Sequence, residues 1–433
     1  MTGNLFQNKT LLVLGANVGA EEIVRYAKDN GAYTIVADYY PPERSKVKQL
    51  ADESALISTA DIESLGKLIE ESHVDGVLAG ISEFNLLKAM ELSNKYNLPF
   101  YCNREQWDNV ENKELFRKLC EENGVPCPRT YYTGERLTEA TLENIRYPAV
   151  IKPVDASASA GVHICMSQEE LLDAEQDAVS HSSCGRIIVE EFVKGNEFTA
   201  HYTISNGTAT LSCIDNRYPV AVHEGNVTTI PAARVFPSHF IDAYISEVNE
   251  QMVRLCQSLG IQDAVLFVQG ICDKVDGFHI FEAGLRPAGE APNRFLERVN
   301  GVNFMHVLVE HALLGRSVSF IPEHEDPYIK GKCCGVVSFV SKGGEVGAID
   351  GLEQAVADTP SVIAYENRYP VGAETPDGNT LRQLMIRFVM VCDSRKQMAE
   401  DIEYLNKHIT VLNDKGENMV VKMEPERLFD PWG

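Results

Sequence analysis

The chain has 433 residues, of which 44% are hydrophobic and 24% are charged, which is typical of a soluble globular protein with roughly two to four domains. Its formal net charge is −24, from 39 basic and 63 acidic residues. Such an acidic balance excludes a broad electrostatic grip on nucleic acid or on anionic membranes, because both depend on Lys and Arg. A pocket for a small anionic ligand stays compatible, since it needs only a few local cations.

The N-terminal segment lacks the layout of a secretory signal, because the apolar run Leu11–Leu14 is too short. Nor does any apolar run approach the roughly 20 residues of a membrane span. The 11 cysteines are scattered without CxxC spacing, which is typical of reduced thiols. We therefore expect a cytoplasmic protein.

Residues 9–101 alternate between short apolar runs and amphipathic stretches. Strands are expected at 10–14, 34–37, 76–79 and 99–101, and helices at 20–30, 64–72 and 83–96. Strands separated by helices of this length predict a parallel, doubly wound sheet, and therefore a Rossmann-like α/β domain.

The turn from Gly15 to Ala20 lies where a dinucleotide fingerprint is expected. It keeps only the first glycine of GxGxxG in register, so a tight strand-to-helix turn is the preferred interpretation. A dehydrogenase that uses this turn is retained as an alternative.

A helix and a phosphate-type loop are predicted next. Asn112 is a candidate N-cap and Gly124 a candidate terminator of a helix that carries Lys113. A strand over 149–153 contains Lys152, and the loop from Asp155 to Gly161 contains only small side chains after its aspartate. Such a loop lets backbone N–H groups approach a phosphate closely, although small-residue loops also serve as plain linkers.

Two further strands are predicted at 186–193 and 197–204. The edge of the first strand, at residues 190–193, offers backbone groups to a planar base. Glu197, which follows the turn, offers a carboxylate to a sugar. The alternative is that these glutamates only face solvent.

The most informative stretch is Phe267–Glu290, which predicts a hairpin around an Asp-Gly turn. If Asp273 faces Phe278, Gln269 lies opposite Glu282, and opposed residues share one face of the sheet. A shared metal ion would explain such a pair. Arg286 follows at short spacing, so an anionic group could be held beside the metal.

The remaining segments carry less chemistry. Asp215–Pro237 is a candidate lining of a substrate pocket, with Arg217 and His223 as candidate carboxylate anchors and His223 with Glu224 as a less favoured acid–base pair. Other expected elements are a helix at 245–259, strands at 333–340 and 362–365, and helices at 380–392 and 396–408. The sequence has no GxSxG, HExxH or GxxxxGK[ST] motif.

The order of these parts resembles the ATP-grasp superfamily over nearly the whole chain. The motifs are IKPVDASASAGV, VEEFVKGNEF and FEAGLRPAG, and within the superfamily they look most similar to carboxylate–amine ligases such as L-amino-acid ligases and biotin-carboxylase-like proteins. The resemblance implies a Rossmann-like domain at 1–103, an ATP-grasp domain at 104–325 with a lid at about 126–195, and a small α+β C-terminal cap at 326–433.

The resemblance also implies roles for individual residues. Lys113 and Lys152 would contact the phosphates of ATP, and Arg286 would steady the transferring phosphoryl group. Gln269 and Glu282 would hold Mg²⁺ or Mn²⁺, since Mg²⁺ prefers hard oxygen ligands. The other implied nucleotide contacts are made by Asp155, Ser157, Ser159 and Gly161 in the loop, Glu190 at the adenine amino group, the backbone of Glu191, Phe192 and Val193, and Glu197 at the ribose.

The implied reaction activates a small carboxylate as an acyl-phosphate and joins it to an amine, with amino acids among the candidate substrates and a homodimer as the candidate assembly. Two positions depart from the family pattern, where Glu is usual at Gln269 and Asn is frequent at Gly284. They motivate the alternative that the protein is a nucleotide-binding protein with weakened catalysis. They also predict weaker or single-metal binding.

Overall fold

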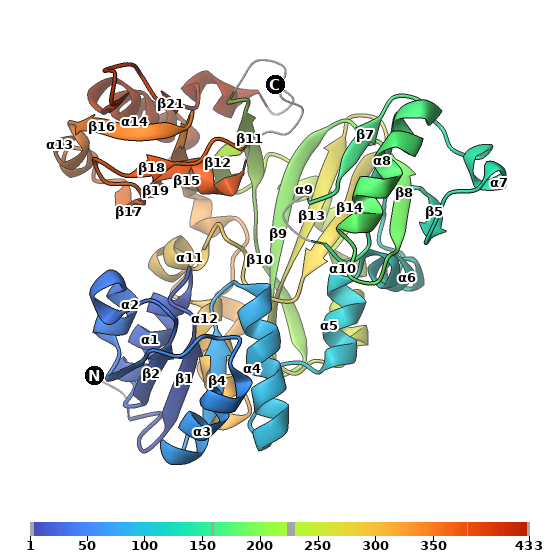
Figure 1. The fold of residues 1–433 in the computed structure, drawn as a ribbon. Helices are drawn as coiled ribbons and strands as arrows, with labels where there is room; N and C mark the ends of the chain where they lie inside the picture. Colours follow the sequence, from blue (N-terminus) through green and yellow to red (C-terminus); the bar gives the residue numbers. More distant parts are fainter. Residues whose placement is uncertain (1–3, 157–159, 223–229, 379, 431–433) are drawn as a thin grey trace.

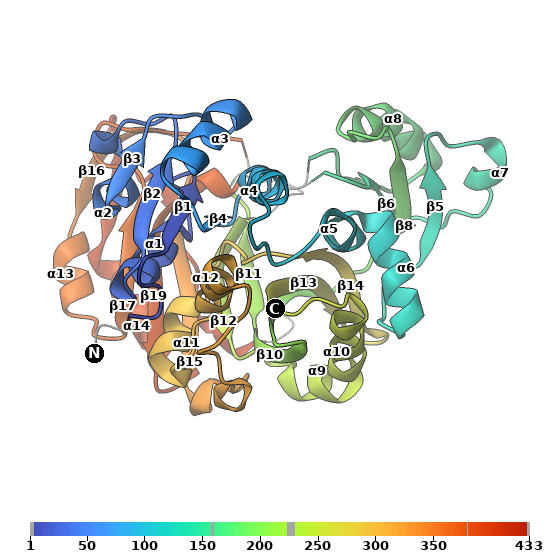
Figure 2. The ribbon, with the colours of Figure 1, turned by 90° about the horizontal axis from the view of Figure 1, so that it is seen from below.

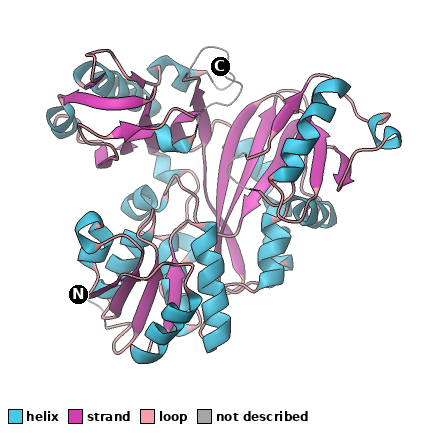
Figure 3. Ribbon diagram, viewed as in Figure 1, coloured by secondary structure: helices cyan, strands magenta, loops and turns pink. Residues whose placement is uncertain are grey.

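The computed structural model describes residues 4–156, 160–222, 230–378 and 380–430. Figure 1 shows three masses: an N-terminal part in blue, a central part from cyan to yellow and a C-terminal part in orange and red. Each combines strands with helices (Figure 3), and the expected mixture of α/β and α+β architecture is confirmed.

The N-terminal part is built on a parallel sheet with the strand order β3-β2-β1-β4. Its strands are β1 (Thr10–Leu14), β2 (Tyr33–Ala37), β3 (Glu53–Ala55) and β4 (Gly76–Ala79). Its helices are α1 (Ala20–Asp29), α2 (Lys46–Leu50), α3 (Ile62–Glu71) and α4 (Glu83–Tyr96). The strand expected at 99–101 is wrong, because these residues form no strand. The Tyr101 hydroxyl instead donates to the Leu285 carbonyl at 3.0 Å.

The segment from β5 to β8, which falls within the expected lid and is called the lid below, forms an antiparallel sheet with the order β5-β8-β6-β7. Its elements are β5 (Thr130–Gly134), α7 (Glu139–Leu142), β6 (Ala149–Pro153), β7 (His163–Cys165), α8 (Gln168–Ser180) and β8 (Ile187–Glu191). The lid has its own small hydrophobic core, and Figure 2 shows it at the right, away from the N-terminal sheet.

Two helices lead into the lid, α5 (Arg104–Glu111) and α6 (Lys113–Asn123). The Asn112 side chain accepts from the backbone of Glu114 at 3.0 Å, and Gly124 ends α6 with a φ of 72°. The expected cap and terminator are therefore both confirmed.

The central sheet has the order β10-β9-β13-β14. Its strands are β9 (Asn196–Ser205), β10 (Thr208–Ile214), β13 (Ala264–Asp273) and β14 (Gly277–Gly284). Nearby helices are α9 (Ile241–Glu247), α10 (Asn249–Ser258), α11 (Asn293–Asn300) and α12 (Phe304–Leu314). The helix expected at 245–259 is confirmed over Asn249–Ser258, but the chain kinks at Val248, where φ is −125°, so the residues before the kink belong to α9.

The hairpin of β13 and β14 pairs Gln269 with Glu282, as the sequence predicted. The predicted turn register is wrong by one residue, since Asp273 pairs with Gly277. A bulge at Phe281 restores the pairing, because Gly270 pairs with Ile280 while Gln269 pairs with Glu282.

The C-terminal part holds a larger sheet with the path β11-β12-β15-β19-β17, to which β21 adds beside β15. Its strands are β11 (Asn216–Val220), β12 (Ile230–Phe236), β15 (Cys333–Ser341), β17 (Val362–Asn367), β19 (Leu384–Cys392) and β21 (Val420–Val421). A second sheet contains β16 (Gly344–Asp350), β18 (Glu374–Thr375) and β20 (Thr410–Asn413), beside α13 (Leu352–Ala357) and α14 (Arg395–His408). Strands β11 and β12 belong to this part although they precede β13 in the chain.

The helix expected at 380–392 is wrong. A short 3₁₀ turn, Leu381–Gln383, precedes strand β19, which lies between β15 and β17. This strand is buried along most of its length, and a strand buried on both faces reads as a continuous apolar run that periodicity cannot separate from a helix. None of the helices among the described residues combines the length and the apolar character that crossing a membrane requires.

Candidate active site

A buried ion triad joins the lid to helix α6. Lys152 on β6 lies 2.6 Å from Glu190 Oε2 on β8, and Arg117 on α6 binds Glu190 Oε1 at 2.5 Å. The side chain of Glu190 is only 2% exposed. Arg117 also donates to the Phe281 carbonyl at 2.7 Å, so the triad reaches the bulge of the central hairpin.

The charges of the triad are strongly coupled. Burial alone would raise the pKa of Glu190, but Lys152 and Arg117 outweigh it and lower that pKa to about 2. Burial lowers the pKa of Lys152, while the Glu190 carboxylate favours its ammonium form. Both oxygens of Glu190 are engaged by cations, so an adenine amino group that donates to this carboxylate, as expected, would share an oxygen with one of them. Its position also orients Lys152.

Arg117 was missed by the sequence analysis, although a signal existed. It follows Lys113 by four residues on one helix, and residues at that spacing share a helix face.

The Lys113 ammonium donates to the Ala156 carbonyl at 2.7 Å and lies 3.9 Å from Glu282 Oε1. Thus Lys113, Lys152, Glu190 and Glu282 converge where lid and central sheet meet.

The described residues at the two ends of the small-residue loop make contacts within the protein. Asp155 is turned toward the end of α8, where its carboxylate accepts from Ser182 Oγ at 2.7 Å and from the Cys184 backbone at 3.1 Å. Gly161 has a φ of 66°, and a Cβ there would lie 3.0 Å from His181 Cβ, which favours glycine on both counts. Ser157 and Ser159 lie outside the described residues.

The segment after β8 carries the remaining expected nucleotide contacts. The Glu191 carboxylate accepts from the Arg129 backbone at 2.7 Å, and the Phe192 N–H donates to the Pro148 carbonyl at 3.3 Å. Val193 follows and is half-buried. Glu197 is the second residue of β9 and lies 2.5 Å from Arg217 on β11, so a ribose would have to share this carboxylate with an arginine.

Gln269 and Glu282 offer two hard oxygens on one face of the hairpin. No group of three or more His, Cys, Asp or Glu side chains that could hold a metal ion occurs within the described ranges. This donor set fits Mg²⁺, which commonly binds one or two protein oxygens together with substrate phosphates and water. It would not form a cage for a structural ion.

The presence of glycine at position 284 has a steric reason that the sequence did not reveal. A Cβ at this position would lie 2.4 Å from the ring of Phe267 and 3.3 Å from Glu111 Oε1. The same ring lies 5.0 Å from the guanidinium of Arg286. Glycine here therefore makes room for the aromatic surface beneath Arg286.

Beyond the hairpin, a second buried ion group connects the central and C-terminal sheets. Arg234 on β12 binds Asp215 Oδ2 at 2.9 Å, Glu290 Oε1 at 2.9 Å and Thr199 Oγ1 at 2.7 Å. Burial raises the pKa of Asp215 to about 6 against the opposing effect of Arg234. This group lies within and beside the predicted pocket segment Asp215–Pro237.

The two candidate carboxylate anchors in that segment differ in outcome. Arg217 is paired with Glu197, whereas His223, and with it the suggested pair with Glu224, lies outside the described residues. His201 on β9 is fully buried beside this group, and burial lowers its pKa to about 4, so its imidazole is neutral.

The acidic residue that the alternative dinucleotide site at the N-terminal turn would use is engaged by the backbone. In such sites an acidic residue after the second strand binds a ribose. Here Asp38 accepts from the Ala16 backbone at 3.0 Å and from the Tyr40 backbone at 2.8 Å. Its two oxygens stabilise the turn.

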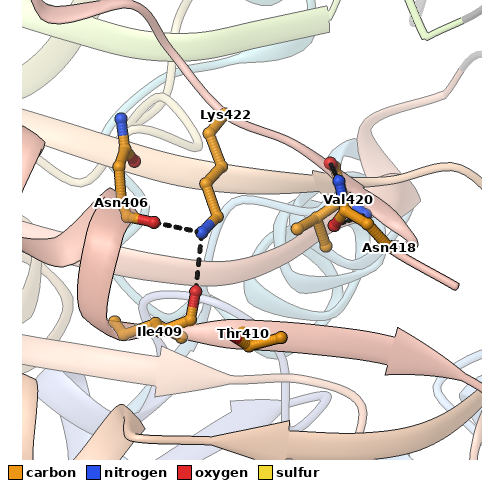
Figure 4. A pocket seen from close by; sticks show the side chains of 6 residues that line it. All are labelled: Asn406, Ile409, Thr410, Asn418, Val420 and Lys422. Atoms are coloured by element: carbon orange, nitrogen blue, oxygen red, sulfur yellow. Dashed lines mark hydrogen bonds between the residues drawn. The ribbon is translucent and has the colours of Figure 1, made fainter. Parts of the chain in front are cut away.

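A hollow of about 270 Å³ lies in the C-terminal part, far in sequence from these residues (Figure 4). Lys422 crosses it and donates to the carbonyls of Asn406 and Ile409 at 2.6 Å each. These carbonyls end helix α14, so the lysine acts as a helix C-terminal partner. No predicted site residue lines this hollow.

Comparison with known proteins adds the family. Residues 145–291 match the family described as an ATP-grasp domain. The chain contains an ATP-grasp domain. The match includes Lys152, Glu190, Glu282 and Arg286, whereas Lys113 and Arg117 lie before it.

Relatives and solved structures extend the likeness beyond the ATP-grasp domain. The carbamoyl phosphate synthase large chain of Methanosarcina acetivorans is 26% identical over 251 residues, which is 55% of this chain and 23% of that protein. The chain thus spans about a quarter of that relative's length. The L-amino acid ligase of Bacillus licheniformis has a TM-score of 0.76 at 19% identity, covering 94% of this chain and 99% of that one.

A second solved structure is the biotin carboxylase domain of a 2-oxoglutarate carboxylase from Hydrogenobacter thermophilus. It is described as a dimer in complex with MgADP, ADP and bicarbonate, and it matches with a TM-score of 0.72 at 16% identity over 97% of this chain and 92% of that one. Both solved structures share the fold over almost the whole chain.

Proposed function

We propose that the protein is an ATP-dependent ligase that activates a small carboxylate as an acyl-phosphate and joins it to an amine, releasing ADP and phosphate. One observation carries the proposal: Lys113 Nζ lies 3.9 Å from Glu282 Oε1. Within an ATP-grasp domain, this brings a phosphate-binding cation beside a candidate metal ligand. The contact joins helix α6 at the lid to the central hairpin.

The positively charged residues have separate roles in this reaction. Lys113 and Lys152 bind the phosphates of ATP, with Lys152 held in place by Glu190, which Arg117 also binds. Arg286 binds the phosphoryl group as it passes to the substrate carboxylate, because a guanidinium matches phosphate oxygens in a planar fork. Phosphoryl transfer depends mainly on such positioning and charge stabilisation.

Gln269 and Glu282 would hold Mg²⁺, which when bound neutralises charge on the phosphates. The amine then displaces phosphate from the acyl-phosphate, so the carbonyl carbon forms a C–N bond while its bond to the phosphate oxygen breaks. The protein's cations hold the departing phosphate.

A phosphate-release screen over amino acids and small carboxylates, each with and without added amines, tests the proposal. Lys152→Ala should lower release by about 10²- to 10³-fold, because one charge contact to the transition state is typically worth that much. Lys67→Ala removes an exposed lysine of α3 and should leave the rate unchanged. Full activity of Lys152→Ala would overturn the assignment of the nucleotide site.

The weakened-catalysis alternative predicts a different result. Tight MgADP binding without phosphate release for any carboxylate and amine pair would favour it over the ligase. Cytoplasmic location, the domain boundaries at 103 and 325 and the homodimer remain proposals of the same kind, with size-exclusion chromatography as the test of the last.

A further inference from the structure

Arg286 and the residue before it are held by side chains from outside the hairpin. The Tyr101 hydroxyl donates to the Leu285 carbonyl at 3.0 Å, and Glu111 Oε1 accepts from the Leu285 N–H at 3.0 Å. Both backbone groups of Leu285 are thus fixed from the connection between the N-terminal part and the lid. These two hydrogen bonds restrict the backbone next to Arg286.

The guanidinium itself is held from further away. Arg286 Nη2 donates to Glu83 Oε1 at 2.6 Å, and Glu83 lies in the first turn of α4 in the N-terminal part. The ring of Phe267 lies under the guanidinium at 5.0 Å. Arg286 Nε is buried and has no hydrogen-bond partner in the described structure.

The ring of Phe267 therefore covers one face of the Arg286 guanidinium and Glu83 occupies one edge, while the Nε–H remains able to donate to another acceptor. The remaining contact, from Nη1 to the Pro287 carbonyl, is long at 3.3 Å. Glu83 is the direct ion-pair partner of Arg286, so it balances the charge and also fixes the orientation. An arginine that must meet a moving phosphoryl group benefits from such fixing, since small misplacements are costly.

We propose that Glu83 is a positioning residue for Arg286, and that the N-terminal part thereby completes the phosphoryl-transfer site. The inference rests on the proposed function for the role of Arg286, but the orientation of Arg286 by Glu83 is testable without turnover. Glu83 acts only through the arginine and needs no contact with substrate.

An ordinary inter-domain ion pair is the competing explanation, and the chain offers a matched control. Glu22 on α1 binds Arg294 Nε on α11, also at 2.6 Å, and this pair likewise joins the N-terminal part to the segment after the hairpin. Glu22→Gln therefore removes the negative charge of an inter-domain ion pair of equal length that does not touch Arg286.

The experiment compares Glu83→Ala, Glu83→Gln and Glu22→Gln in the full-length protein. Phosphate release gives kcat and the KM for ATP, and calorimetry gives the dissociation constant for MgADP. Glu83→Ala should lower kcat by about 10- to 100-fold while leaving MgADP affinity within about twofold. Glu83→Gln, which keeps an acceptor at the same reach, should lie between wild type and Glu83→Ala, and Glu22→Gln should match wild type.

A second readout is the labelling of Arg286 by phenylglyoxal, followed by mass spectrometry. Labelling should be faster in Glu83→Ala than in wild type and unchanged in Glu22→Gln. Equal labelling in all variants, or an equal kcat loss in Glu83→Ala and Glu22→Gln, overturns the inference. If wild type releases no phosphate with any substrate pair, the proposed function fails, while labelling still decides whether Glu83 fixes Arg286.

Discussion

Glu190 illustrates how the fold gives a single residue partners that its place in the sequence does not reveal. Its position on a strand beside the nucleotide site was expected, and its carboxylate was assigned to the adenine. In the fold the carboxylate is buried between Lys152 and Arg117. A buried charge is strongly destabilised without a partner, so Glu190 and the cations around it form one unit.

Glu111 supports a prediction at the same scale. Burial raises its pKa from 4.5 to about 8, opposed by Arg286. As the pH rises, the unfolded chain therefore loses the Glu111 proton at a lower pH than the folded protein does. The stability that the protonated carboxyl contributes is fully present below pH 4.5 and is lost as the pH rises toward 8. By pH 8 the loss should reach a few kcal/mol, since each pKa unit is worth about 1.4 kcal/mol.

Glu111→Gln should remove this dependence, because the amide stays neutral. Urea unfolding of wild type and variant at pH 5 and pH 8 measures it. Glu105→Gln, at an exposed position of the same helix, should behave like wild type. If the free energies of unfolding of wild type and Glu111→Gln differ by the same amount at both pH values, the pKa argument is contradicted.

At the scale of elements, the bulge of the central hairpin determines which residues face each other at the proposed metal site. Without the extra residue at Phe281, the turn register would place Gln269 opposite Phe281 and move Glu282 out of line. Bulges re-aim side chains in this way near functional sites. Phe281 also accepts from Arg117 through its carbonyl, so the bulge is tied to the triad that holds Lys152.

The hairpin also supports a prediction on metal affinity. Gln269→Glu adds a carboxylate on the face that carries Glu282, and a second negative charge should strengthen Mg²⁺ binding. The Mg²⁺ concentration for half-maximal ATP turnover should fall about tenfold, equivalent to about 1.4 kcal/mol. Gln262→Glu adds the same charge at an exposed position before β13 and should not change it. An unchanged Mg²⁺ dependence in Gln269→Glu would refute the charge argument.

For the whole molecule, the proposed site is an assembly of parts that are distant in the chain. Lys152 comes from the lid, Glu282 from the central sheet, and the partner of Arg286 from the N-terminal part. A ligand that binds all of these should stabilise the folded protein, by about 2.7 kcal/mol at a concentration 100 times its dissociation constant.

MgADP should therefore raise the melting temperature of the wild type, as measured by differential scanning calorimetry. Lys152→Ala should lose most of this increase. Lys422→Ala, in the C-terminal hollow, lowers stability by removing a helix partner but should retain the increase. A nucleotide effect lost in Lys422→Ala and kept in Lys152→Ala would place the nucleotide in the hollow instead.

The sequence by itself determined what local patterns can encode. Strand and helix alternation predicted the N-terminal sheet, Asn112 and Gly124 predicted the bounds of α6, and the motif order predicted the ATP-grasp fold. These signals are local in the chain, because propensity, caps and turns act over a few residues.

Tertiary structure alone decided the features that depend on distant neighbours. Strand β19 forms because β15 and β17 flank it, and its buried apolar run was indistinguishable from a helix. Gly284 is required because Phe267 and Glu111 occupy the space above it. Arg117, Glu111 and Glu83 acquire their roles only through partners far along the chain, since burial and charge pairing arise when the parts pack together.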